Sequence, residues 1–158
     1  MFEYRVTKYN PAFRNELGGY IPEDWTSMSE IGREFEGVVL SEDEYRRVEQ
    51  AYIDSAFAFL SESGLTSLRV RGLENHQKLV LEFGEGSVLS LDEISGVMRR
   101  ILREELWCRL EAPSGFVHFG WDYYMYIGVP QRCPAAEKRA GELGLYPEDF
   151  ASPYRESS

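Results

Sequence analysis

The sequence contains two histidines, His76 and His118, and two cysteines, Cys108 and Cys133, as its most reactive side chains near neutral pH. A cysteine and a histidine within hydrogen-bond distance can form a nucleophilic pair. Cys108 and His118 both lie in segments with the alternation of β-strands, but their positions predict opposite faces of the sheet. His76 lies in a polar turn, where we expect it to be solvated. These four residues therefore predict no nucleophilic site.

Other patterns that carry chemistry are absent or unspecific. The sequence has no CxxC, HExxH or EF-hand loop, which are the common local patterns of metal sites. The segment Gly84-Glu85-Gly86 is too short and too acidic to hold a phosphate. Pairs of carboxylates can be chosen from any acidic chain, so they do not indicate a glycosidase. We predict no catalytic residue, no metal ion, no cofactor and no enzymatic activity.

Charge is more informative than these motifs. The net charge is −10, which disfavours nucleic acid and anionic membranes as direct partners. Most of the asymmetry lies in one belt, where a single base, Arg33, accompanies Glu23, Asp24, Glu30, Glu34, Glu36, Glu42, Asp43 and Glu44. The belt is interpreted either as a solvated face that keeps the protein in solution or as a docking surface for a basic protein.

An aromatic stretch from Phe116 to Gly128 predicts a β-hairpin, preceded by a strand from Leu106 to Glu111. Turn lengths place Glu111 opposite Phe116, and Phe119 opposite Tyr123. This register predicts a core face consisting of Leu106, Cys108, Leu110, Val117, Phe119, Tyr123, Met125 and Ile127. It predicts an outer face consisting of Trp107, Arg109, Glu111, Phe116, His118, Tyr124 and Tyr126.

The outer face mixes aromatic rings with charged groups, a composition that is enriched at protein interfaces. We therefore interpret it as a second contact surface for a partner. In the alternative interpretation, the third helix or the N-terminal loop covers it, or its tyrosines pair across the strands with their hydroxyls in water.

The elements that position these residues follow from hydrophobic periodicity and capping signals. We expect strands at 2–9, 67–71, 79–83, 106–111 and within 116–128, and helices at 42–62, from 91 to about 102, and at 135–143. A short helical turn is expected after Ser27, at a capping box that Glu30 completes. The order β-α-β-β-α-β-β-β-α predicts one α+β domain over 1–158, with a mainly antiparallel sheet, helices on one face and a loosely ordered tail at 153–158.

The two long helices begin with similar sequences. Residues 36–48 and 85–97 share eight of thirteen positions, including the pattern EGxVLSxDE. This similarity indicates either an old duplication or convergence, because a cap serine and first-turn acids are favoured independently at any helix start.

The sequence lacks a run of 18 apolar residues and an apolar signal core, so we predict a cytoplasmic protein without a membrane-spanning helix. With only two cysteines, we expect free thiols. In size and charge the chain resembles small acidic bacterial immunity and inhibitor proteins, a resemblance of general character that no motif supports. It implies a basic partner such as a toxin or nuclease.

In this hypothesis the belt acids steer the encounter, and Trp25, Trp107, Tyr124 and Tyr126 supply apolar contacts. One alternative is a small-molecule binding domain or an enzyme, with a pocket between the central helix and the aromatic sheet. A homodimer formed through the outer sheet face is another.

Overall fold

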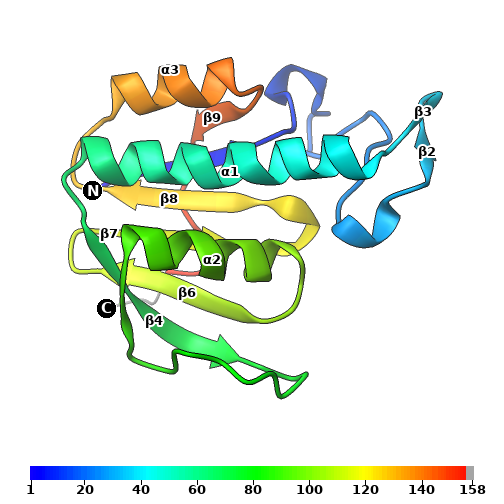
Figure 1. The fold of residues 1–158 in the computed structure, drawn as a ribbon. Coiled ribbons are helices and arrows are strands. Elements are labelled where there is room, and N and C mark those ends of the chain that lie inside the picture. Colours follow the sequence, from blue (N-terminus) through cyan, green and yellow to red (C-terminus); the bar gives the residue numbers. More distant parts are fainter. Residues whose placement is uncertain (156–158) are drawn as a thin grey trace.

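A computed structural model describes residues 1–155 of the chain. Its main sheet is antiparallel and has seven strands in the order β5-β4-β6-β7-β8-β1-β9, with three helices in one layer against it (Figure 1). The strands are β1 Phe2–Thr7, β4 Ser67–Glu74, β5 Val88–Ser90, β6 Trp107–Ala112, β7 Gly115–Phe119, β8 Met125–Val129 and β9 Tyr146–Asp149. A separate hairpin consists of β2 Glu34–Phe35 and β3 Val38–Val39. The predicted α+β class is confirmed.

The helices are α1 Glu42–Glu62, α2 Leu91–Leu102 and α3 Pro134–Glu142. Short 3-10 turns occur at Pro11–Phe13, Met28–Glu30 and Trp121–Tyr123. Both long helices begin at the predicted caps, because Ser41 and Ser90 accept hydrogen bonds from the backbone three residues later. The short turn expected after Ser27 is present at Met28–Glu30, but the predicted side-chain cap is not formed, since the Ser27 hydroxyl bonds to Ser29 instead.

The hydrophobic core lies between the helical layer and the sheet. The long helix α1 supplies much of it, including Tyr52 and Phe59, which are fully buried. Tyr123 packs edge-on against Tyr52 with ring centroids 4.8 Å apart, and it also contacts Tyr45 and Trp25. Such aromatic contacts add to the stability that burial of the rings provides.

Two strands differ from the sequence-based expectation. Segment 79–83 is not a strand, because the two antiparallel neighbours of β4 are β6 and β5, and Ser67 pairs with Ser90 of β5. The turn after β4 carries Lys78 at φ 53°, and the segment that follows packs Leu81 and Phe83 against the core without joining the sheet. Strand β9 was not expected because it contains Pro147 and acids, which are tolerated at the edge of a sheet.

The repeated sequence forms the same local structure twice. Gly37 and Gly86 adopt φ values of 85° and 84°, which favour glycine, and each is followed by a short strand and a serine-capped helix. The surroundings differ, because β3 pairs only with β2, whereas β5 is an edge of the main sheet. The motif therefore encodes a local turn-strand-helix start in two different settings.

Candidate functional site

The predicted division of β6, β7 and β8 into two faces agrees with the structure. All eight residues assigned to the core face are buried. Glu111 pairs with Phe116 as expected, but Phe119 pairs with Met125 rather than Tyr123. The turn after β7 is therefore two residues longer than predicted, and a shift of two residues leaves every side chain on the same face.

The interpretation of the outer face as an exposed contact surface is wrong for three of its residues. Phe116, His118 and Tyr126 are buried, because the segment that follows β9 crosses this face. Within that segment Phe150 and Tyr154 contact the ring of Tyr126, with centroid distances of 5.9 and 6.0 Å. The cover is thus the C-terminal segment, whereas α3 lies in the helical layer on the other face.

The remaining outer residues are partly covered. Tyr124 accepts a hydrogen bond from Arg14 of the N-terminal loop at 2.8 Å, so this loop covers one end of the face. Arg109 is half-buried, and its guanidinium lies 3.9 Å from Glu111. Trp107 remains half-buried beside an open cavity.

Part of the predicted tail contacts the rest of the protein. Tyr154 packs against Trp107 with ring centroids 5.7 Å apart, and Arg155 forms an ion pair with Glu3 at 3.0 Å. The other predicted tail residues, 156–158, lie outside the described residues.

His118 belongs to a buried chain of hydrogen bonds. Its Nδ1 lies 2.7 Å from the hydroxyl of Ser152, and its Nε2 lies 2.9 Å from a carboxylate oxygen of Glu111. These residue types occur in hydrolase triads. However, His118 is fully buried, Ser152 is 8% exposed, and neither lines the cavity described below. These hydrogen bonds therefore hold the C-terminal segment against the sheet.

The two thiols are also unsuited to nucleophilic chemistry. Cys108 lies on the core face of the sheet, whereas His118 lies on the outer face. Burial raises the pKa of the Cys108 thiol to about 12. Burial likewise raises the pKa of the Cys133 thiol to about 11. Both cysteines are free, and thiols with such pKa values are largely protonated at neutral pH.

Burial of His118 leads to a pH prediction. Burial lowers its pKa below the ordinary value of 6.5, although the hydrogen bond to Glu111 opposes this effect. The unfolded chain therefore binds more protons, so the free energy of unfolding decreases as the pH drops below the ordinary histidine value. We expect urea unfolding between pH 8 and pH 5 to show a smaller decrease for His118→Gln than for the wild type. Equal decreases in the two proteins would contradict this explanation.

The acidic belt is mostly exposed. Exposed side chains are those of Glu23, Glu34, Glu36, Glu42, Asp43 and Glu44. Asp24 and Glu30 are half-buried, because Asp24 pairs with Lys8 at 2.7 Å and Glu30 accepts a hydrogen bond from Thr26 at 2.7 Å. The hairpin β2–β3 projects beyond the start of α1 (Figure 1), and Val38 is 70% exposed on it.

Trp25, which was predicted to be an apolar contact residue for a partner, lies in the core. It is 6% exposed, and its ring centroid is 5.4 Å from Tyr45 and 5.0 Å from Tyr123. The prediction is wrong because the belt segment turns inward at this point and inserts the indole beneath the start of α1.

A cavity of 450 Å³ opens at the end of the sheet that also holds Trp25 and the start of α1. It lies between the end of α2, the start of β6 and the turn after β7. Five aromatic residues line it, together with four acids: Trp107, Phe119, Trp121, Tyr123 and Tyr154, and Glu74, Glu104, Glu105 and Asp122. No lysine or arginine is among its described lining residues, so carboxylates are its main charged groups.

The local backbone explains how the aromatic part of the cavity forms. Asp122 and Tyr123 adopt φ values of 62° and 67°, so the chain reverses sharply and places Tyr123 in the core while Trp121 stays 83% exposed. Such conformations are strained for bulky residues and are enriched at functional sites. The hydroxyl of Tyr9 supports the turn by donating to the carbonyl of Asp122 at 2.6 Å.

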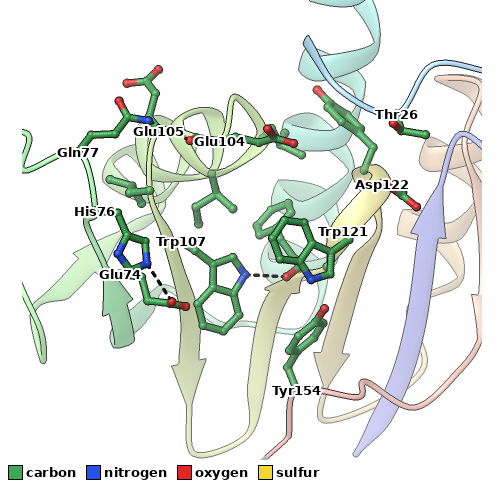
Figure 2. A pocket seen from close by; sticks show the side chains of 16 residues that line it. Thr26, Glu74, His76, Gln77, Glu104, Glu105, Trp107, Trp121, Asp122 and Tyr154 are labelled. Atoms are coloured by element: carbon green, nitrogen blue, oxygen red, sulfur yellow. Dashed lines mark hydrogen bonds and ion pairs between the residues drawn. The ribbon is translucent and has the colours of Figure 1, made fainter. Parts of the chain in front are cut away.

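Figure 2 shows the two indoles of the cavity and Tyr154 grouped at one side. Trp107 is held in place, because its Nε1 donates to the carbonyl of Phe119 at 2.8 Å. His76 lies 3.3 Å from Glu74 but is otherwise exposed, in agreement with its predicted solvation. The cavity thus combines one fixed indole and one exposed indole with several carboxylates, which is the chemistry that binds organic cations.

Other types of site find less support. Within residues 1–155 no group of three or more histidines, cysteines, aspartates or glutamates is arranged to hold a metal ion. None of the described helices is both long and apolar enough to cross a membrane.

Comparison with known proteins yields no relative. No family model, no curated protein and no solved structure matches the chain.

The sequence did not predict the cavity. Its residues come from the N-terminal loop, the end of β4, the α2–β6 connection, the turn after β7 and the C-terminal segment, so no local pattern joins them. Trp121 offered the one local signal, since an aromatic residue in a predicted polar turn has no core to join.

Proposed function

We propose that this protein is a non-catalytic binding protein that docks a basic protein partner at its acidic end. The acidic end is defined here as the belt Glu23–Glu44 together with the four cavity carboxylates, Glu74, Glu104, Glu105 and Asp122. The observation that carries the proposal is the cavity, which adjoins the exposed belt. Its lining is aromatic and acidic, and no lysine or arginine is among the described residues that form it.

The belt and the cavity lie close together. In Figure 1, the hairpin β2–β3, the start of α1 and the end of α2 lie at the same end of the molecule. Thr26 of the belt segment lines the cavity directly. The Tyr9 hydroxyl, which bonds to Asp122, also lies 3.4 Å from the carbonyl of Trp25. A partner could therefore contact both features at once.

Charge and shape support a protein partner. Carboxylates of one sign attract a basic surface over a long range and raise the association rate. The projecting hairpin adds Val38 and Val39, which are 70% and 57% exposed, as apolar contacts among the acids. Val38 and Val39, rather than the buried outer face of the sheet, therefore supply the apolar contacts with the proposed partner. The resemblance in size and charge to immunity and inhibitor proteins favours a toxin or nuclease as the partner.

Affinity capture tests this proposal. The protein is immobilised and exposed to lysate of its source cells at about 0.1 M and about 1 M salt, where charges are screened beyond roughly 10 and 3 Å. We expect a basic protein that is retained at low salt. The triple variant Glu34→Gln, Glu36→Gln, Asp43→Asn should retain it about tenfold less, because these exposed acids steer the encounter.

A matched triple variant provides the control. Glu82→Gln, Asp92→Asn and Glu142→Gln also remove three exposed acids, and Asp92 occupies in α2 the position that Asp43 occupies in α1. Retention should be unchanged in this control. An equal loss in both triple variants, or retention of a partner without a basic surface, contradicts the proposal.

A small organic cation is a second candidate ligand, because the cavity volume of 450 Å³ falls in the range of small-molecule sites. The cavity lies at the end of the sheet, rather than between α1 and the aromatic strands as expected. That space is filled by Tyr45, Tyr52 and Tyr123. A thermal-shift screen of amines and guanidines distinguishes this candidate, since one compound should then stabilise the isolated protein strongly.

A further inference from the structure

We propose that the cavity at the acidic end receives an arginine side chain of the basic partner, an inference that rests on the proposed function. The ligand class follows from three features of the cavity: its aromatic wall, its charge and its degree of closure. Each feature favours a flat cation attached to an apolar stem.

The aromatic wall fits a guanidinium group. Trp121 presents an indole that is 83% exposed and has no place in the core. Trp107 presents a second indole, which its hydrogen bond to Phe119 fixes in orientation. A guanidinium is planar and weakly hydrated, so it stacks on an indole at a smaller desolvation cost than an ammonium does.

The carboxylates provide acceptors around that wall. Glu104 and Asp122 are exposed and form no ion pair with another described residue. Glu105 is only loosely paired, with Arg100 at 3.8 Å. An arginine carries five N–H donors in a fixed plane, so its edge can donate to a carboxylate at the rim while its face stays on an indole.

The partial closure of the cavity favours an amphipathic stem. Apolar side chains at the end of α2 and just before β6, including Ile101 and Leu106, form part of the lining. The methylene groups of an arginine can pack there while the charged head reaches the acids at the rim. A phosphate or a nucleic acid would meet four carboxylates and no described lysine or arginine in this lining, which excludes these ligands on electrostatic grounds.

The test uses a short blocked peptide, Gly-Arg-Gly, with matched peptides that contain lysine or citrulline. The indole N–H signals of Trp107 and Trp121 in nuclear magnetic resonance spectra report occupancy. We expect the arginine peptide to shift both signals and the lysine peptide to bind several-fold more weakly, because the flat guanidinium matches the indole face better. The citrulline peptide has nearly the same shape without the charge and should not bind.

Two variants localise the binding. Asp122→Asn preserves the turn, because asparagine tolerates a positive φ, and it should weaken binding of the arginine peptide through the loss of charge. Trp121→Ala should weaken it by about tenfold, the range of a partly desolvated cation–π contact. Phe13→Ala, which truncates an exposed aromatic residue outside the cavity, should leave the affinity unchanged.

The outcomes separate this inference from the proposed function. If the arginine peptide leaves both indole signals unmoved, the inference of an arginine site is wrong. The proposed capture of a partner through the belt is tested separately, by retention on the belt triple variant. Equal binding of the arginine and citrulline peptides also overturns the inference. If Trp121→Ala retains the captured partner as well as the wild type does, an arginine of that partner does not occupy the cavity.

Discussion

Replacing Glu49 with alanine is expected to lower the free energy of unfolding by about 2–4 kcal/mol, because it removes a buried carboxylate that two partly exposed arginines and a tyrosine share. Glu49 lies on α1, and its side chain is fully buried. Arg103 donates to it at 2.9 and 3.0 Å, Arg99 forms a second ion pair with it, and the Tyr45 hydroxyl donates at 2.7 Å. Without the carboxylate, these donors lose their shared acceptor at the contact between α1 and α2.

A matched control comes from the same helix. Glu42 pairs with Arg46, but both side chains are 63% exposed, so Glu42→Ala should change stability by less than about 1 kcal/mol. Urea unfolding of both variants measures the difference. A cost for Glu49→Ala no larger than that for Glu42→Ala would show that the buried network does not hold the helices together.

The ionisation of Glu49 should also make the stability of the protein depend on pH. Burial alone would raise the pKa of Glu49, but the hydrogen bonds from Arg103, Tyr45 and Arg99 outweigh burial and hold the pKa below the ordinary 4.5. The ionised form thus stabilises the fold above the ordinary carboxyl pKa, and this stability is lost as the pH falls through the lower, folded value. Glu49→Gln should therefore show a shallower loss of stability between pH 6 and pH 3.

Replacing Tyr123 with alanine is the second large change, with an expected cost of about 3–5 kcal/mol for loss of a buried aromatic ring. The ring contacts Trp25, Tyr45 and Tyr52, and its hydroxyl donates to that of Tyr45 at 3.0 Å. Tyr123→Phe keeps the ring and loses only this hydrogen bond, so it should cost about 1 kcal/mol.

The adjacent Trp121 supplies the control for this experiment. Its side chain is 83% exposed, so Trp121→Ala should change the free energy of unfolding by no more than about 0.5 kcal/mol. Chemical denaturation compares the variants. A large cost at Trp121 would assign the indole a role in stability and remove part of the argument for a binding role.

Features encoded over short distances were predictable from the sequence. Ser41 and Ser90 determine where their helices begin, because capping involves only neighbouring residues. The alternation in β6, β7 and β8 gave the correct faces even though the turn after β7 is longer than expected. Alternation, however, predicts only which side of the sheet a residue occupies and not what covers that side.

The cover and the cavity depend on contacts between distant segments. Ser152 reaches His118 across 34 positions, and Tyr154 reaches Trp107 from a segment that was predicted to be a loose tail. Trp25 lies within the acidic belt, so its neighbours in sequence gave no sign that its ring joins the core. Such contacts leave no periodic signal in the sequence.

A hydrogen-exchange footprint of the complex tests directly whether the partner docks at the acidic end. The captured partner is added to the wild-type protein, and amide exchange is compared with that of the free chain. We expect new protection at the hairpin β2–β3, at the start of α1 and at the turn containing Trp121. Protection confined to α3 and β9, with the acidic end unchanged, would contradict docking at that end.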